Sequence, residues 1–280
     1  FKEEQAIMKR KFISAALVLS LAGTLALTGC GGEEAGGEDT VIKVGATPAP
    51  HAEVLEVIKD NLEEEGYTLE IVEYNDYILP NKAVSEGELD ANYFQHISYL
   101  NNYNEENGTD LVSAGSIHYE PFALYAGTTS SIDDLADGAQ IAVPNDGTNE
   151  GRALKLLEAQ GLITLDPEAG FLATKLDIVE NPHNLDIVEM EAAQLPRVLE
   201  TVDMAVINGN YAIDAGLNLS DAIAIEADDS EAAEAYANVV AVANGNEDSE
   251  KIQALVNALK SDEVKQFMEE TYGGAVVPLF

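Results

Sequence analysis

The spacing of hydrophobic positions changes in a regular way after residue 40. Short apolar runs that predict strands alternate with longer segments in which apolar residues recur every three or four positions, as on one face of a helix. The first unit predicts a strand at 41–46, a helix at 52–65 and a strand at 68–74. Such alternation is typical of an α/β fold in which mainly parallel sheets are covered by helices on both faces.

The alternation continues to the C-terminus, over about 240 residues. Further strands are expected near 89–93, 111–117, 122–126, 140–143, 185–190, 204–208 and 239–243, and further helices near 97–105, 149–160, 192–201, 249–261 and 262–271. Two sheets in two lobes fit this length better than one. Because open α/β sheets bind ligands beyond the carboxyl ends of their strands, we expect the functional site in the cleft between the lobes.

The first 30 residues follow a different pattern. Residues 8–11 are a short cationic segment, and residues 12–27 form an apolar run of 16 positions. This run is shorter than the roughly 20 apolar residues that span a bilayer, which favours a cleaved signal peptide. Its end, LTGC at 27–30, resembles a bacterial lipobox and implies cleavage before Cys30 and lipid attachment to the sulfur. The alternative is an ordinary secretory signal followed by a coincidental cysteine.

The N-terminal part is therefore expected to have two pieces. Residues 1–29 are upstream residues plus a signal peptide that is removed, and residues 30–39 are the lipidated Cys30 and a flexible, charged tether. Residues 1–7 precede a natural-looking start at Met8, and we expect them not to belong to the biological protein. The lipid would anchor the mature chain at the extracytoplasmic face of the cell membrane.

The composition is strongly acidic, with 14 Lys+Arg against 51 Asp+Glu and a formal net charge of −37. Such a surface is repelled by phosphate, which excludes nucleic-acid binding, and it is poor at self-association, which favours a monomer. A single cysteine excludes an intramolecular disulfide and a cysteine-based zinc cluster.

No familiar catalytic or cofactor motif occurs in the chain. The four histidines never fall at metal-binding helical spacing, so the sequence predicts no metal site, no cofactor and no catalytic residue. A hydrolase that uses paired carboxylates stays open, because some of the many acids must lie near each other in the fold.

Aromatic residues gather where a predicted strand ends. Phe94, His96 and Tyr99 follow one another there, and Tyr77 stands at the equivalent end of an earlier strand. Aromatic faces in this position can hold an apolar or thioether side chain. The alternative is that they fill the core between helix and sheet.

Three polar residues suit the charged head of an amino acid. Arg152, one of two arginines after residue 30, lies in the first turn of a predicted helix, where a helix start and a guanidinium both favour an anion. Asn208 and Asn238 lie at strand ends, and an amide both donates and accepts hydrogen bonds. A surface ion pair for the arginine and turn roles for the asparagines are the alternatives.

Four segments in order resemble the methionine-binding lipoproteins of ABC importers, the MetQ/NlpA family. They are DANYFQHISYL at 90–100, VPNDGTNEGRAL at 143–154, EAAQLPR at 191–197 and AVINGNYA at 205–212. The resemblance implies a two-lobed periplasmic-binding-protein (type II) fold with methionine in the cleft and an ABC permease as partner. On matching positions, the side chain would be surrounded by Tyr77, Phe94, His96 and Tyr99, the carboxylate would bind Arg152, and the amino and carboxylate groups would be held by Asn208 and Asn238.

The resemblance also implies lobes that are discontinuous in sequence. We expect lobe I to comprise 40–121 and 236–280, and lobe II to comprise 122–235. Ser98 and Gly147 stand where the family usually has proline, so the identity of the ligand stays open among L-methionine, D-methionine, a methionine-containing dipeptide and another small amino acid. A surface adhesin or an extracellular hydrolase on the same scaffold is the competing class.

Overall fold

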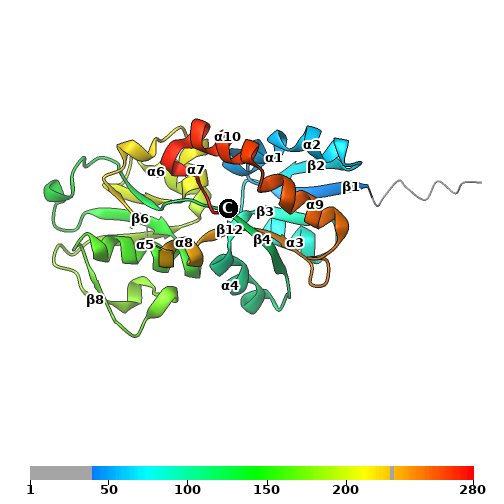
Figure 1. Cartoon of the computed structure of the whole chain (residues 1–280). Coiled ribbons are helices and arrows are strands. Elements are labelled where there is room, and N and C mark those ends of the chain that lie inside the picture. The colour runs from blue at the N-terminus through cyan, green and yellow to red at the C-terminus, as the bar shows by residue number, and fades with distance from the viewer. Residues whose placement is uncertain (1–39, 228–229) are drawn as a thin grey trace, which may run out of the picture. The chain divides into compact units, whose positions relative to one another are not determined.

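The computed structural model of the chain describes residues 40–227 and 230–280 (Figure 1). The predicted signal peptide, the tether and Cys30 lie outside the described residues. Within the described residues, no helix combines the length and the apolar character that a membrane span needs.

The first lobe is built on a six-stranded sheet with the order β13-β4-β12-β3-β1-β2. Its strands are β1 (Val41–Ala46), β2 (Thr68–Glu73), β3 (Ala91–His96), β4 (Val112–Tyr119), β12 (Ala237–Val242) and β13 (Val277–Pro278). Its helices are α1 (Glu53–Val57), α2 (Lys59–Glu64), α3 (Leu79–Ser85), α4 (Ile97–Asn107), α9 (Glu250–Leu259) and α10 (Asp262–Tyr272), preceded by a helical turn, η1 (Pro48–Ala52).

The second lobe is built on a five-stranded sheet with the order β11-β5-β10-β6-β9. Its strands are β5 (Ala123–Ala126), β6 (Gln140–Pro144), β9 (Asp186–Met190), β10 (Met204–Ile207) and β11 (Ala224–Ile225), and its helices are α5 (Gly147–Ala159), α6 (Leu195–Val198), α7 (Gly209–Asp214) and α8 (Ser230–Ala235). A small antiparallel pair, β7 (Thr164–Leu165) with β8 (Ile178–Glu180), stands apart from both sheets. The lobe boundaries drawn from the sequence stay a prediction.

Both faces of the first sheet are buried, as continuous apolar strands require. Val240 and Val242 of β12 pack with residues of α1, α2, α9 and α10. Val239 and Ala241, which point the other way, pack with residues of α3 and α4. The second sheet follows the same rule, with α5 on one face and α6 and α7 on the other.

Both sheets are mixed, where the sequence predicted mainly parallel ones. β1, β2 and β3 are parallel, but β12 is inserted antiparallel between β3 and β4. In the second sheet β6, β9 and β10 are parallel, and β5 is antiparallel to both of its neighbours. β12 and β5 are the strands through which the chain arrives from the other sheet. Helical crossovers within one sheet impose a common direction, and these two strands are not reached by one.

Two predicted helices are shorter than expected. The helix predicted at 52–65 is divided, because Ile58 leaves helical geometry at φ −95° and ψ 0° between α1 and α2. The helix predicted at 192–201 is a 3₁₀ turn at Ala192–Gln194 followed by the four-residue α6. Pro196 stands in the first turn of α6, where proline is accommodated because its missing N–H would have no partner in the helix.

Candidate functional site

A pocket lies between the two lobes. It is lined by Tyr77, Phe94, Gln95, His96, Tyr99, Glu120, Asn149, Arg152, Asn208, Gly209, Asn210 and Asn238. All seven ligand-binding residues that the sequence predicts are in this set. His96 ends β3 and Asn208 follows β10, so the pocket lies at the carboxyl ends of strands from both sheets. Their role in binding a ligand stays a prediction.

One wall of the pocket is aromatic. The ring of Tyr77 has its centroid 5.8 Å from that of Phe94, 5.7 Å from that of Tyr99 and 4.9 Å from that of Tyr211. The Tyr77 hydroxyl donates to Asn210 Oδ1 at 2.5 Å, which joins the first lobe to the second. Burial raises the pKa of Tyr77 well above its ordinary value, so the phenol is neutral. The aromatic rings therefore give this wall an apolar surface, and the Tyr77 hydroxyl at its edge is uncharged.

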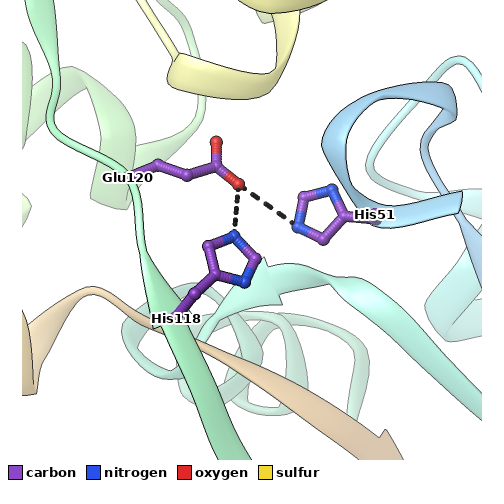
Figure 2. A group of neighbouring side chains, drawn as sticks. All are labelled: His51, His118 and Glu120. Carbon is purple, nitrogen blue, oxygen red and sulfur yellow. Dashed lines mark hydrogen bonds and ion pairs between the residues drawn. The ribbon is translucent and has the colours of Figure 1, made fainter. Parts of the chain in front are cut away.

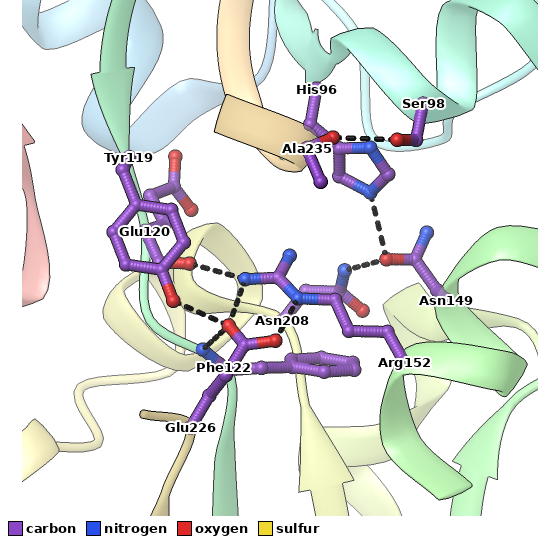
Figure 3. Close-up of polar contacts among 10 residues, drawn as sticks. All are labelled: His96, Ser98, Tyr119, Glu120, Phe122, Asn149, Arg152, Asn208, Glu226 and Ala235. Carbon is purple, nitrogen blue, oxygen red and sulfur yellow. Dashed lines mark hydrogen bonds and ion pairs between the residues drawn. The ribbon is translucent and has the colours of Figure 1, made fainter. Parts of the chain in front are cut away.

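His96 links this wall to polar residues of the second lobe (Figure 3). Its Nδ1 accepts from the backbone N–H of Tyr99, which caps the start of α4. Its Nε2 therefore carries the proton and donates to Asn149 Oδ1 at 3.2 Å. Burial, and then the positive charge of Arg152, lower the pKa of His96 to about 3. The imidazole is neutral at physiological pH and holds a hydrogen-bonding position.

Asn149 hydrogen-bonds to His96 of the first lobe and Asn208 of the second, and the sequence did not predict it as a site residue. Asp146, the N-cap of α5, accepts the backbone N–H and the side-chain amide of Asn149. The amide orientation is thereby fixed, and its Oδ1 accepts from His96 and from Asn208 Nδ2, the latter at 2.9 Å. Asn149 lies in the segment 143–154 and in the first turn of α5. That position is the feature of the sequence from which a site role could have been predicted.

Asn208 has an unsatisfied atom. With its Nδ2 bound to Asn149, its Oδ1 has no hydrogen-bond partner, and it is the one buried side-chain nitrogen or oxygen atom in this condition among the described residues. Native proteins rarely leave such an atom unpaired, because its desolvation costs about 1–3 kcal/mol. An acceptor of this kind in a pocket favours a ligand with an N–H or O–H donor.

Arg152 is buried and already paired (Figure 3). Its Nε and Nη2 donate to Glu226 Oε1 and Oε2 at 2.8 and 2.6 Å, and Nη2 also donates to the backbone oxygen of Glu120. From the sequence, we expected the guanidinium of Arg152 to bind a ligand carboxylate through two N–H groups. In the structure, two of these groups bind Glu226 instead. Nη1 takes part in none of these bonds and is the donor left for a ligand. The ring of Tyr236 supports the guanidinium carbon at 4.0 Å from its centroid.

Glu226 stays ionised despite its burial. Burial by itself would raise the pKa of this carboxyl group, but the charge and hydrogen bonds of Arg152, with a hydrogen bond from the Tyr119 hydroxyl, lower it below the ordinary value. The arginine and the glutamate are therefore both charged and compensate each other.

A second polar group lies beside the pocket (Figure 2). His118 Nε2 and His51 Nε2 lie 2.7 and 3.3 Å from Glu120 Oε1. The Thr47 hydroxyl contacts His51 Nδ1 at 2.7 Å, and the Tyr93 hydroxyl contacts His118 Nδ1. If both hydroxyls donate to Nδ1, both Nε2–H groups are free to donate to Glu120 Oε1, and this pattern gives every ring nitrogen of the group a partner.

The carboxylate of Glu120 is the charged member of this group. Burial would raise its pKa, but the hydrogen bond from His118 and the charge interactions with the two histidines and Arg152 lower it below the ordinary value. Burial lowers the pKa of His51 to about 4, so this imidazole is neutral. The group thus places one buried negative charge at the edge of the pocket.

The same three side chains are the group among the described residues that could hold a metal ion, since their ligand atoms lie within 4.8 Å of one another. The sequence predicted no such group, because His51 and His118 are far apart along the chain. The fold brings their rings to a centroid distance of 5.2 Å. The direct bonds from the histidines to Glu120 account for the arrangement without an ion.

Comparisons with known proteins identify the family of this chain. Residues 42–280 match the family model described as NlpA lipoprotein. The D-methionine-binding lipoprotein MetQ of Salmonella typhimurium is 44% identical over 274 residues, which cover 96% of this chain and 99% of that protein.

Solved structures are equally similar. A lipoprotein of Ruminococcus gnavus is 55% identical with a TM-score of 0.85, and the match covers 86% of this chain and 100% of that one. A nutrient-binding protein of Burkholderia cenocepacia bound to methionine is 45% identical with a TM-score of 0.81, covering 85% of this chain and 100% of that one. These likenesses confirm the α/β, two-lobed periplasmic-binding-protein fold. The sequence and the fold together place this chain in the NlpA lipoprotein family.

Proposed function

We propose that this chain is an extracytoplasmic substrate-binding lipoprotein that takes up methionine between its lobes and delivers it to an ABC importer. The observation that carries the proposal is the pocket itself, which is lined by an aromatic wall, by the unpartnered acceptor Asn208 Oδ1 and by the guanidinium of Arg152. The family membership and the methionine in the Burkholderia cenocepacia relative support it.

The thioether of methionine fits the aromatic wall. Sulfur against ring edges contributes about 0.3–1.5 kcal/mol per contact, and Tyr77, Phe94 and Tyr99 offer three rings around one space. The carboxylate would accept from Arg152 Nη1 and from Asn238 Nδ2. Asn238 is turned for this role, because His51 Nε2 lies 3.1 Å from its Oδ1 and leaves the amide nitrogen free.

The mechanism is closure of the lobes around the ligand. Contacts that join the lobes, such as the bond from Tyr77 to Asn210 and that from His96 to Asn149, exist only when the lobes are together. A ligand that touches both sides adds its own contacts to these and shifts the open and closed populations by its preference for the closed form. The permease would then recognise the closed form. This role requires no catalytic step.

Anchoring by lipid at Cys30 belongs to the same proposal, and the lipoproteins among the relatives support it. Lipid on this residue would keep the protein close to its permease in the membrane. Replacing Cys30 by serine should move the protein from the membrane fraction to the soluble fraction after cell lysis. A variant that stayed in the membrane fraction would contradict the anchor.

A ligand screen tests the binding function. The full chain, solubilised in mild detergent and refolded to remove carried-over ligand, is melted with each common L-amino acid, with D-methionine and with methionine dipeptides. A ligand at 100 times its dissociation constant should add about 2.7 kcal/mol of stability, which raises the melting temperature by several degrees. A shift confined to methionine compounds supports the proposal and names the ligand. No shift with any of them contradicts it.

A further inference from the structure

The two carboxylate oxygens of Glu120 have different surroundings. Both histidines approach Oε1, while Oε2 points away from them toward the ribbon of α7 (Figure 2). A Cβ atom built on Gly209, the first residue of α7, would lie 2.7 Å from Oε2. The contacts of Glu120 with both histidines use Oε1, so Oε2 lies at the second lobe's side of the pocket and is the oxygen left for a ligand.

Contacts with its neighbours keep this buried carboxylate ionised. Burial would raise its pKa, but the hydrogen bond from His118 and the charges of nearby groups lower it below the ordinary value. The nearest guanidinium, that of Arg152, is paired with Glu226. A buried carboxylate whose second oxygen faces the pocket favours a cationic group of the ligand.

Asn208, whose Oδ1 is unpartnered, directly precedes Gly209 in the chain, and both residues line the same pocket as Glu120. An ammonium group has three N–H donors and no acceptor. Glu120 Oε2 and Asn208 Oδ1 supply two of the acceptors that such a group needs, and one of them carries a full negative charge.

We propose that Glu120 is the specificity-determining counter-ion of the ligand's α-ammonium group, so that the pocket accepts free α-amino acids and rejects analogues without the positive charge. This inference rests on the proposed function and adds to it a requirement on the ligand's chemistry. His118 and His51 hold the carboxylate in place, and Asn208 accepts a second N–H from the same ammonium.

The first test compares two ligands on the unaltered protein. Isothermal titration of the full chain in detergent is carried out with L-methionine and with its 2-hydroxy analogue, in which a hydroxyl replaces the amino group. We expect methionine to bind at least about 100-fold more tightly, because only the ammonium neutralises Glu120. Equal affinities for the two compounds would overturn the inference while leaving the binding function intact.

The second test repeats both titrations on Glu120→Gln, with Glu70→Gln as the matched control. Glu70 is an exposed carboxylate of the same lobe that pairs with Lys43 on the surface. Glu120→Gln should lose at least about tenfold in affinity for methionine and change little for the hydroxy analogue, so that the preference shrinks. A parallel loss for both ligands would show a merely structural role and overturn the inference. If the unaltered protein binds no methionine, the proposed function fails as well.

Discussion

Arg152 and Glu226 form a buried two-pronged ion pair across 74 positions of the chain. The pair fixes the guanidinium plane, and the rings of Tyr236 and Phe122 pack on it. The one donor nitrogen that remains, Nη1, is therefore presented in a single direction. Such preorganisation reduces the entropy that a ligand must lose to meet it.

Replacing Arg152 by alanine should weaken methionine binding by about 2–4 kcal/mol and also lower the free energy of unfolding, because Glu226 then stays buried without its partner. Titration calorimetry and thermal melts measure the two effects. Arg197→Ala is the matched control, since Arg197 is exposed and lies outside the pocket. Unchanged affinity in Arg152→Ala would remove this residue from the site.

Replacing Tyr77 by phenylalanine should weaken binding by about 1 kcal/mol, or roughly fivefold. The ring and its contacts remain, but the hydroxyl that donates to Asn210 across the lobes is lost. Titration of the variant beside Tyr67→Phe, a tyrosine packed on the core of the first lobe, gives the comparison. If both variants bind alike, the bond between Tyr77 and Asn210 contributes nothing to closure.

The free energy of unfolding should fall as the pH is lowered from 7.5 to 5. Burial lowers the pKa of His51 to about 4 and that of His96 to about 3, whereas an unfolded histidine titrates near 6.5. The unfolded chain therefore binds more protons in this interval, so stability is complete above about pH 6.5 and is lost toward the folded pKa values. The loss is about 2 kcal/mol for each of the two histidines between pH 7.5 and pH 5.

Urea unfolding at the two pH values checks this dependence. His96→Gln should reduce the difference between them by about 2 kcal/mol, because one of the two groups no longer titrates. His183→Gln is the control, since His183 is exposed. If the free energy of unfolding changes between the two pH values by the same amount in His96→Gln as in the unaltered chain, His96 is not held neutral in the folded protein.

Replacing Gly209 by alanine should weaken methionine binding at least about tenfold, because the new methyl group would lie 2.7 Å from Glu120 Oε2 and 2.8 Å from its Cβ. The carboxylate would have to move from its present position in the pocket. Gly274→Ala is the control, since a Cβ there meets no atom within 4 Å. Titration calorimetry measures the affinities, and an unchanged value for Gly209→Ala would show that the pocket can adjust at this point.

The sequence by itself located most of the longer elements and seven of the residues that line the pocket, but it did not predict α3, α7 or α8. Apolar spacing located α4, α5, α9 and α10 within a few residues, because these helices are long enough for their periodicity to be unambiguous. The segments around Phe94, Arg152 and Asn208 pointed to residues that do line one pocket. In α/β folds, ligands bind beyond the carboxyl ends of the strands. A polar or aromatic residue that follows a predicted strand could therefore be predicted to line the site.

Only the tertiary structure decided which distant side chains meet. That Arg152 faces Glu226, that His51 and His118 share one carboxylate, and that Asn208 keeps an unpaired oxygen all depend on contacts between separate parts of the chain. The antiparallel insertion of β12 is of the same kind. Periodicity reports only whether a residue is buried. Which partner it finds depends on how the sheets pack and pair, and neighbouring residues in the sequence do not encode that.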